Sequence, residues 1–191
     1  GQTRVPCTFS IDTDHQVFSI NSSISQADAE LLEFSTRAQS QSCLWFAECG
    51  NRITASKFGL VCKKICLIEN NPNKCNINSG FYTTVYAPKR ISSCATTYGL
   101  MHERSAIEEY KVQSNNHTHP CGLIVNPSAP FLGASPDGLV CSNGITGLIE
   151  VKCPYNARDM ELLEAVGHLN NFHLELCPYS GELVLKRNHS Y

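Results

Sequence analysis

The chain has 191 residues, of which 42% are hydrophobic and 17% charged, and its formal net charge is −2. This length suits one domain, or one domain with an arm, and is enough to bury a substantial core. The near-neutral charge argues against a polybasic tail or a membrane-surface protein, so any binding of nucleic acid has to come from a local patch. No apolar stretch approaches the roughly 18 residues that span a bilayer, and no signal-peptide core begins the chain, which predicts a soluble protein.

Eleven cysteines are an odd and high number for a chain of this length. A secreted disulfide framework usually has an even number in a much shorter chain, so the sequence favours reduced thiols and an intracellular protein, nuclear or cytoplasmic. Three N-x-S/T sequences, at Asn21, Asn116 and Asn188, point weakly the other way. Without a signal sequence we interpret them as chance matches.

The first 50 residues predict an arm followed by helices. Residues 1–24 have a mixed sequence, in which VPCTFSI and HQVFSI are candidates for short edge strands. Residues 25–39 predict an amphipathic helix, because apolar residues recur at helical spacing. These residues are Ala27, Leu31, Phe34 and Ala38. Residues 42–49 predict further helix that ends at Gly50, with three residues expected to pack inward: Leu44, Trp45 and Phe46.

A possible anion site follows in NRITASKFG. Thr54 is a suitable N-cap for a helix from Ala55 to about Lys64. Arg52 and Ser56 would then lie beside a helix N-terminus, where backbone N–H groups can receive an anion. The polar stretch over 66–93 predicts a long loop or a poorly defined segment of helix and loop.

The clearest helix is predicted over 96–113. Its expected inner face combines Leu100, Ile107 and Tyr110 with Glu103. A carboxylate on an apolar face needs a cation or hydrogen-bond donors, because an isolated buried charge is very unfavourable. The ordinary explanation is an ion pair between Glu103 and an Arg or Lys.

The segment SPDGLVCSNGITGLIEVKCPY, residues 135–155, predicts a tight hairpin. Asn143 and Gly144 suit a two-residue type I′ turn, since both tolerate positive φ. Counting outward from the turn opposes Ser142 to Ile145, Cys141 to Thr146, Leu139 to Leu148, and Asp137 to Glu150. Like charges directly opposed in a sheet are destabilising. A positive charge is therefore expected near Asp137 and Glu150.

A divalent metal ion would supply that charge. Glu150 and Lys152 project from one face of a strand, and Asp137 adds a second carboxylate there. Converging oxygen ligands are typical of Mg²⁺ sites, and Lys152 could then orient or deprotonate a water. The alternative is that SPDG is a simple turn and that E-x-K is a surface salt bridge. The apolar second strand favours the first interpretation, because its charged face is then unlikely to be freely solvated.

Four blocks carry a family resemblance. RITASKFG, YGLMHERSAIEEY, LGASPDGLV and IEVKCPY occur in this order between Arg52 and Tyr155. With Pro136-Asp137 and Glu150-Val151-Lys152, the sequence resembles the lambda exonuclease branch, or YqaJ-type viral recombinases, of the PD-(D/E)-x-K nucleases. The resemblance implies an α/β fold of the restriction-endonuclease-like kind, with a central mixed sheet flanked by helices. The sheet is expected to hold the 135–153 hairpin and strands over 172–187, and a further helix is predicted over 158–169.

The resemblance also implies the chemistry of the site. Metal ligands would be Glu103, Asp137, Glu150 and the carbonyl of Val151, Mg²⁺ or Mn²⁺ the cofactor, and Lys152 the residue that assists the water. Arg52 and Ser56 would lie near a DNA phosphate. The implied activity is digestion of double-stranded DNA from 5′ ends, in some members by a ring-shaped trimer. Residues 25–191 would form the nuclease core, truncated at its C-terminal end, because a family segment with paired Gln residues does not follow.

Two other interpretations stay open. Structural zinc could join two sets of residues: Cys62, Cys66 and Cys75, and His117, His119 and Cys121. Neither set has the paired C-x-x-C of a common zinc site, and free cysteine is ordinary core material, so zinc is the less favoured interpretation. The second is a catalytically inactive descendant that keeps the fold and binds DNA or a protein.

Overall fold

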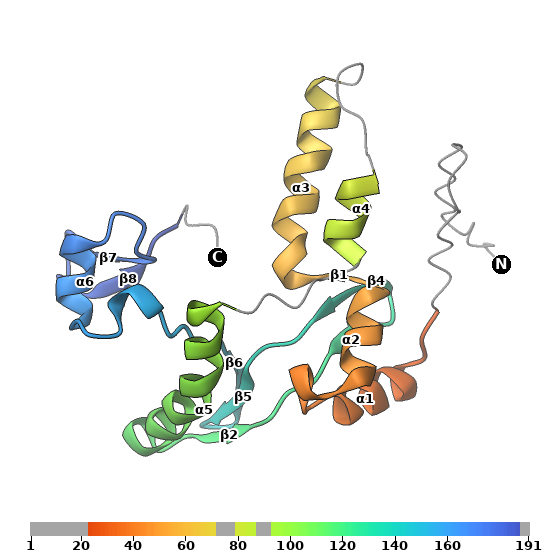
Figure 1. The fold of residues 1–191 in the computed structure, drawn as a ribbon. Coiled ribbons are helices and arrows are strands. Elements are labelled where there is room, and N and C mark those ends of the chain that lie inside the picture. Colours follow the sequence, from red (N-terminus) through yellow and green to blue (C-terminus); the bar gives the residue numbers. More distant parts are fainter. Residues whose placement is uncertain (1–22, 72–78, 87–92, 188–191) are drawn as a thin grey trace.

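The computed structural model describes residues 23–71, 79–86 and 93–187 (Figure 1). Helix α1 (Gln26–Ser35) begins where the hydroxyl of Ser25 accepts a hydrogen bond from the N–H of Asp28. A 3₁₀ turn, η1 (Gln39–Gln41), leads to α2 (Cys43–Gly50), which Ser42 caps in the same way. Both helices were predicted. The arm strands predicted over VPCTFSI and HQVFSI lie outside the described residues.

The next helices extend further than the sequence indicates. Helix α3 (Ala55–Asn70) begins after Thr54 as predicted but continues beyond Lys64. Within the stretch 66–93, the helix-and-loop alternative is the one found, because α4 (Ser79–Tyr86) packs against α2 and buries Val85. Helix α5 (Cys94–Ser114) begins with a capping box between Ser93 and Thr96.

The strands within the described ranges form three short sheets. The first is mixed: β1 (Ile53–Thr54) runs parallel to β4 (Ala129–Ala134), and β3 (Ile124–Asn126) pairs antiparallel on its other side. The second contains β2 (His117–His119), β5 (Gly138–Ser142) and β6 (Ile145–Ile149), all antiparallel. The third is the hairpin of β7 (Leu174–Leu176) and β8 (Leu183–Leu185). Short sheets lie among helices, so the predicted α/β class is confirmed.

One detail of the predicted sheet is wrong. The strands over 172–187 do not join the sheet that holds the 135–153 hairpin, because β7 and β8 pair with each other alone. They form a separate small unit with α6 (Leu162–His168), around a core of Ala157, Ala165 and Phe172. The helix predicted from residue 158 begins only at Leu162, since residues 155–157 form the 3₁₀ turn η2.

The other core lies where α1 and α2 meet the first sheet, and we call α1, η1, α2, β1, β3 and β4 the hub. Leu32, Cys49, Leu123 and Val125 form its buried centre. Thr36 is also fully buried, and its hydroxyl donates to the carbonyl of Leu32 at 2.6 Å and accepts from the N–H of Leu123 at 2.8 Å. Of the residues predicted to pack inward, Trp45 and Phe46 are half-buried but Leu44 is exposed.

Gly122 lies in close contact with the C-terminal end of α1. Its N–H donates to the carboxylate of Glu33 at 2.9 Å. A Cβ atom at this position would lie 1.9 Å from the carbonyl oxygen of Glu33 and 2.5 Å from the hydroxyl of Thr36. Only glycine fits here, because real Cβ atoms essentially never approach other atoms this closely.

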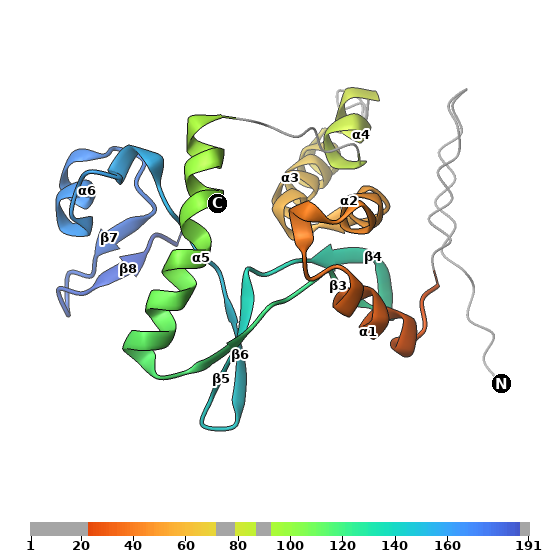
Figure 2. The ribbon, with the colours of Figure 1, turned by 60° about the horizontal axis from the view of Figure 1, so that its bottom comes forward.

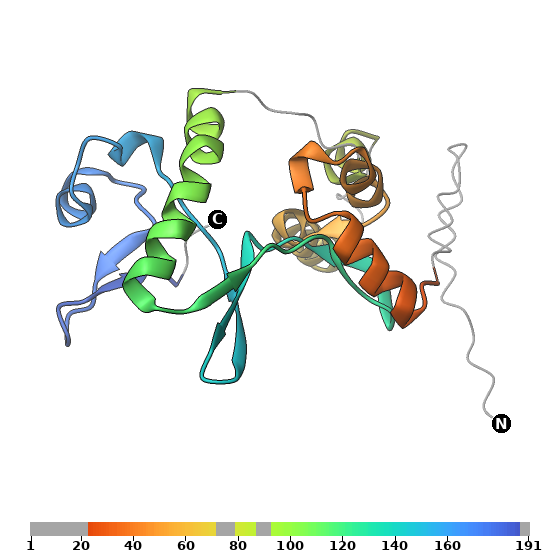
Figure 3. The ribbon, with the colours of Figure 1, turned by 90° about the horizontal axis from the view of Figure 1, so that it is seen from below.

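Helix α5 lies between the hub and the α6–β7–β8 unit, and the β5–β6 hairpin projects away from it (Figures 2 and 3). The helix packs on η2 and β2. Because this contact covers a narrow strip, Glu103 and Ile107 are half-buried, whereas Leu100 is 63% exposed and Tyr110 39% exposed. The predicted inner face is therefore wrong at these last two positions. In the described part of the chain, no helix is both long and apolar enough to cross a membrane.

Candidate active site

The β5–β6 hairpin has the predicted turn and register. Asn143 and Gly144 have φ angles of 49° and 77°, as a type I′ turn requires. Ser142 pairs with Ile145 and Leu139 with Leu148, and the ladder ends where Gly138 meets Ile149. One position further out, Asp137 and Glu150 follow directly after the last pair. The Asp137 carboxylate accepts a hydrogen bond of 2.6 Å from the N–H of Val151.

Glu103 reaches the same place from helix α5. No ion pair joins it to Arg or Lys in the described ranges. Its pKa is raised, first by burial and then by the charges of Asp137 and Glu150, while Lys152 has a smaller lowering effect. The contact between α5 and η2 that holds the helix here includes the edge-to-face rings of Tyr98 and Tyr155, 5.7 Å apart. Helix and hairpin thus bring three carboxylates and one ammonium group into electrostatic range.

The pKa of Asp137 is raised in a similar way to that of Glu103. Burial raises its pKa, the N–H of Val151 lowers it, and the charge of Glu150 raises it further, so that the net direction is upward. Lys152 forms an ion pair with Glu150, and both side chains are largely exposed. The E-x-K sequence thus forms the surface salt bridge of the alternative interpretation, and the expectation that this charged face is shielded from solvent is wrong. Lys152 therefore lies at the exposed edge of the candidate site. The carboxylates of Glu103 and Asp137, further inside, keep excess negative charge.

The donor set fits a hard divalent cation. Carboxylate oxygens of Glu103, Asp137 and Glu150, with the carbonyl of Val151, are the oxygen ligands that Mg²⁺ prefers. Across the described residues, no three His, Cys, Asp or Glu side chains are already arranged to hold a metal. Here the carboxylate of Asp137 is bonded to a backbone N–H, and that of Glu150 to Lys152. Burial is the largest cause of the raised pKa values of Glu103 and Asp137, and the neighbouring carboxylates raise them further. A bound cation would favour the ionised forms of both groups.

The two residues predicted near phosphate have different positions. Ser56 is exposed on the first turn of α3, 3.2 Å from the hydroxyl of Thr54. Arg52 is only 3% exposed and lies inside the hub. Its guanidinium donates to the carbonyl of Pro130 at 3.0 Å and forms an ion pair with Glu48. Direct contact of Arg52 with phosphate stays a prediction, and in this conformation its side chain connects α2 to β4.

Sequence reasoning missed two residues that hold the segment before Asp137. The side-chain amide of Gln39 donates to the carbonyls of Cys121 and Pro136, at 2.8 and 2.9 Å. The indole N–H of Trp45 donates to the hydroxyl of Ser135 at 2.7 Å. These bonds join residues 82 to 97 positions apart in the chain, and no short-range pattern signals them.

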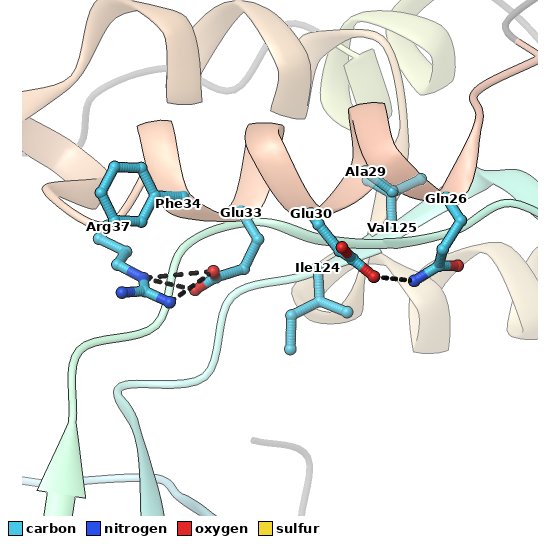
Figure 4. Close-up of a pocket in the computed structure, with 8 residues that line it drawn as sticks. All are labelled: Gln26, Ala29, Glu30, Glu33, Phe34, Arg37, Ile124 and Val125. Carbon is cyan, nitrogen blue, oxygen red and sulfur yellow. Dashed lines mark hydrogen bonds and ion pairs between the residues drawn. The ribbon is translucent and has the colours of Figure 1, made fainter.

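A shallow pocket of about 400 Å³ lies elsewhere, between α1 and β3 of the hub (Figure 4). Its polar side chains are already bonded to one another: Arg37 pairs with Glu33, and Gln26 donates to Glu30. The pocket therefore offers no chemistry to rival the carboxylate site.

The residues of the zinc alternative are dispersed. Cys62 and Cys66 are exposed on α3, and His117 and His119 are exposed on β2, whereas Cys121 is buried in the hub. Cys75 lies outside the described residues. The described cysteines and histidines thus give this alternative no assembled site.

The sequence of the chain matches a known protein family. The model of the YqaJ-like viral recombinase domain matches residues 25–169, and the chain belongs to this family. This confirms the resemblance carried by the four sequence blocks. No curated protein sequence matches the chain.

Solved structures with similarity include an alkaline exonuclease, LHK-Exo, from Laribacter hongkongensis, with 25% identity and a TM-score of 0.41. Its complex with dAMP gives 31% identity and a TM-score of 0.44, and both alignments cover 64% of this chain and 57% of that one. A SOX–DNA complex gives 18% identity and a TM-score of 0.47, over 66% of this chain and 24% of SOX. The chain thus spans little more than half of the exonuclease.

Proposed function

We propose that this protein is a metal-dependent deoxyribonuclease that digests double-stranded DNA from 5′ ends and leaves 5′-phosphates. One observation carries the proposal: Glu103 from α5 lies within electrostatic range of Asp137, Glu150 and Lys152, at the end of the β5–β6 ladder. Membership of the YqaJ-like family supports it, and the similar solved structures include an alkaline exonuclease and a DNA complex.

In this proposal Glu103, Asp137, Glu150 and the carbonyl of Val151 hold Mg²⁺ or Mn²⁺. Such an ion, when bound, lowers the pKa of a water molecule and withdraws charge from a phosphoryl oxygen. Side chains of the protein orient the ligands and the water. Asp137 is fixed by the N–H of Val151, so its free carboxylate oxygen keeps one direction. Lys152 orients the water and stabilises the negative charge that develops on the phosphate.

The DNA backbone would approach along the N-terminus of α3. Ser56 is exposed on the first turn of this 16-residue helix, and a helix N-terminus favours phosphate. Arg52 contributes by holding β1, and hence the start of α3, against β4. Double-stranded DNA is the proposed partner, and a homotrimer is part of the same proposal, tested by the mass of the protein with and without duplex.

The test uses 5′-phosphorylated linear duplex and closed circular duplex, each with Mg²⁺ and with EDTA. Release of nucleotides from linear duplex alone, only with Mg²⁺, is the expected result. Asp137→Asn and Lys152→Ala should each lower the rate by about 10²-fold or more with the fold intact by circular dichroism. The matched control is Lys111→Ala, an exposed lysine on α5, which should cut at the wild-type rate. Undiminished cutting by either site variant would remove the assignment.

A second candidate is a DNA-binding domain without catalysis. The existing pair of Lys152 with Glu150 favours it, because a lysine held by a carboxylate is less available to phosphate. Such a protein would bind duplex in EDTA with a salt-dependent affinity but release no product with Mg²⁺. The same incubations therefore separate the two functions.

A further inference from the structure

The amide of Gln39 connects two distant parts of the chain. Its nitrogen donates one hydrogen to the carbonyl of Cys121 at 2.8 Å and the other to the carbonyl of Pro136 at 2.9 Å. Cys121 and Pro136 are both buried, so these carbonyls need partners within the protein. Pro136 immediately precedes Asp137, and the bond therefore acts on the backbone that carries this carboxylate.

The backbone of Gln39 is itself unusual. Its φ is 42°, in the left-handed region that residues other than glycine seldom adopt. Backbone strain of this kind persists only where surrounding contacts fix the residue, and it concentrates at functional positions. Here the strained conformation places the side chain between the two carbonyls.

Trp45 provides a second, independent bond to the same segment. Its ring packs against the hub core, and its N–H donates to the hydroxyl of Ser135 at 2.7 Å. Both residues before Asp137 are thus held from the hub, by η1 and by α2. On the other side, Asp137 is held by the N–H of Val151.

We propose that Gln39 and Trp45 are positioning residues, which fix Ser135 and Pro136 and thereby direct the carboxylate of Asp137 toward Glu103 and Glu150. They do not touch substrate. The proposal rests on the proposed nuclease function for its catalytic consequence, but the geometric statement can be tested without cleavage.

The first experiment measures hydrogen exchange of single amides by NMR in the 191-residue protein. The N–H of Val151 reports on its bond to Asp137, and the N–H of Cys177, bonded to the carbonyl of Glu182 at 2.8 Å in the distant hairpin, reports on general loosening. Gln39→Ala should speed exchange at Val151 about 5- to 10-fold, the effect of one hydrogen bond, and leave Cys177 unchanged.

Trp45→Phe should give a similar change, because it removes the indole N–H and keeps a smaller aromatic ring at this position. The matched control is Gln41→Ala, an exposed glutamine of the same 3₁₀ turn, which should alter neither amide. Equal acceleration at Val151 and Cys177 would show general destabilisation and overturn the proposal. No acceleration at Val151 in either variant would overturn it as well.

The second experiment measures cleavage of 5′-phosphorylated duplex over a range of Mg²⁺ concentrations. Displacement of Asp137 should lower kcat about 10- to 100-fold in Gln39→Ala and raise the Mg²⁺ concentration at half-maximal rate, with KM for duplex unchanged. A change in KM alone would place Gln39 and Trp45 in DNA binding and contradict positioning. If the wild-type protein does not cleave, the proposed function fails, and exchange at Val151 still decides the positioning proposal.

Discussion

The hub and the candidate active site differ in how their charged side chains are paired. In the hub, Glu33 accepts from both Arg37 and the N–H of Gly122, and Arg52 is paired with Glu48. At the site, Glu103 and Asp137 face carboxylates, and Lys152 is paired at the edge with Glu150. The hub is thus electrostatically complete within the chain, whereas the site leaves negative charge for a bound cation to balance.

The pKa shifts express this difference. Burial alone would raise the pKa of Glu33, but its bonds to Arg37 and Gly122 outweigh burial and lower it. The pKa values of Glu103 and Asp137 are raised, first by burial and then by neighbouring carboxylates. Ionised Glu33 is thus stabilised by its partners in the hub, whereas ionisation of Glu103 and Asp137 is unfavourable at the site.

The strongest way to break the comparison is to damage the hub at its tightest point. Gly122→Ala places a methyl group against the carbonyl of Glu33, and we expect a loss of about 3 kcal/mol or more in the free energy of unfolding, or no folded protein. Gly59→Ala on α3 is the control, since nothing lies within 4 Å of its added Cβ atom. It should stabilise the helix by about 0.5–1 kcal/mol. Urea unfolding measures both, and a Gly122→Ala midpoint equal to wild type would contradict the tight hub.

Arg52 gives the next largest effect. Arg52→Ala leaves the carboxylate of Glu48 and the carbonyl of Pro130 without their partner, so stability should fall by about 2–4 kcal/mol. The double variant Arg52→Met with Glu48→Leu removes both charges and should recover most of that loss. Unchanged stability with weakened duplex binding would instead place Arg52 at the DNA phosphate and move it from the hub to the site.

Acid should affect the two regions in opposite directions. The pKa of Glu33 is lowered from its ordinary value of 4.5, so its contribution to stability is present above pH 4.5 and lost as pH falls through its folded pKa. The raised pKa of Glu103 means that its negative charge destabilises the fold at neutral pH, and protonation relieves this as pH falls through the folded pKa toward 4.5.

Two glutamine variants separate these effects. Glu33→Gln should destabilise the protein at pH 7 and reduce the loss of stability at low pH, whereas Glu103→Gln should raise the Tm at pH 7. Unfolding curves between pH 3 and pH 8 measure both. If both variants destabilise the protein equally at pH 7, the contrast between hub and site fails.

The smallest effect is expected at an exposed ion pair outside both regions. Lys111 pairs with Glu108 on α5. Lys111→Ala should change the free energy of unfolding by at most about 0.5 kcal/mol, because solvent screens such pairs. The change in the free energy of unfolding for this variant is the reference for the hub and site variants. A larger loss in urea unfolding would mean that α5 depends on its surface charges.

Local sequence was sufficient for the parts of this protein that local rules control. Asn143-Gly144 and the alternating hairpin residues predicted the turn and the register, and hence the opposition of Asp137 and Glu150. Ser25 and Ser42 act as helix caps at the predicted starts. The four family blocks correctly indicated the family and the α/β class.

Properties that depend on long-range packing could not be predicted. The burial of Arg52 depends on a carbonyl 78 positions away, and the position of Gln39 on carbonyls at 121 and 136. The exposure of Leu100 depends on how narrow the contact of α5 with η2 and β2 is. The separation of β7 and β8 from the larger hairpin depends on their own core with α6. Periodicity describes the faces of an element but not which neighbour covers them.

The hub has a consequence for how the chain is made. Its bonds from Glu33 to Gly122 and from Thr36 to Leu123 span 89 and 87 residues. Helices α3, α4 and α5, whose backbone hydrogen bonds are local, leave the ribosome before β3 does. During much of translation, α1 and α2 therefore lack the strands against which they pack. Contacts this far apart in sequence form slowly, and apolar surface stays uncovered meanwhile. Nascent chains stalled before residue 122 should therefore be the ones that chaperones bind and that proteases cut within α1.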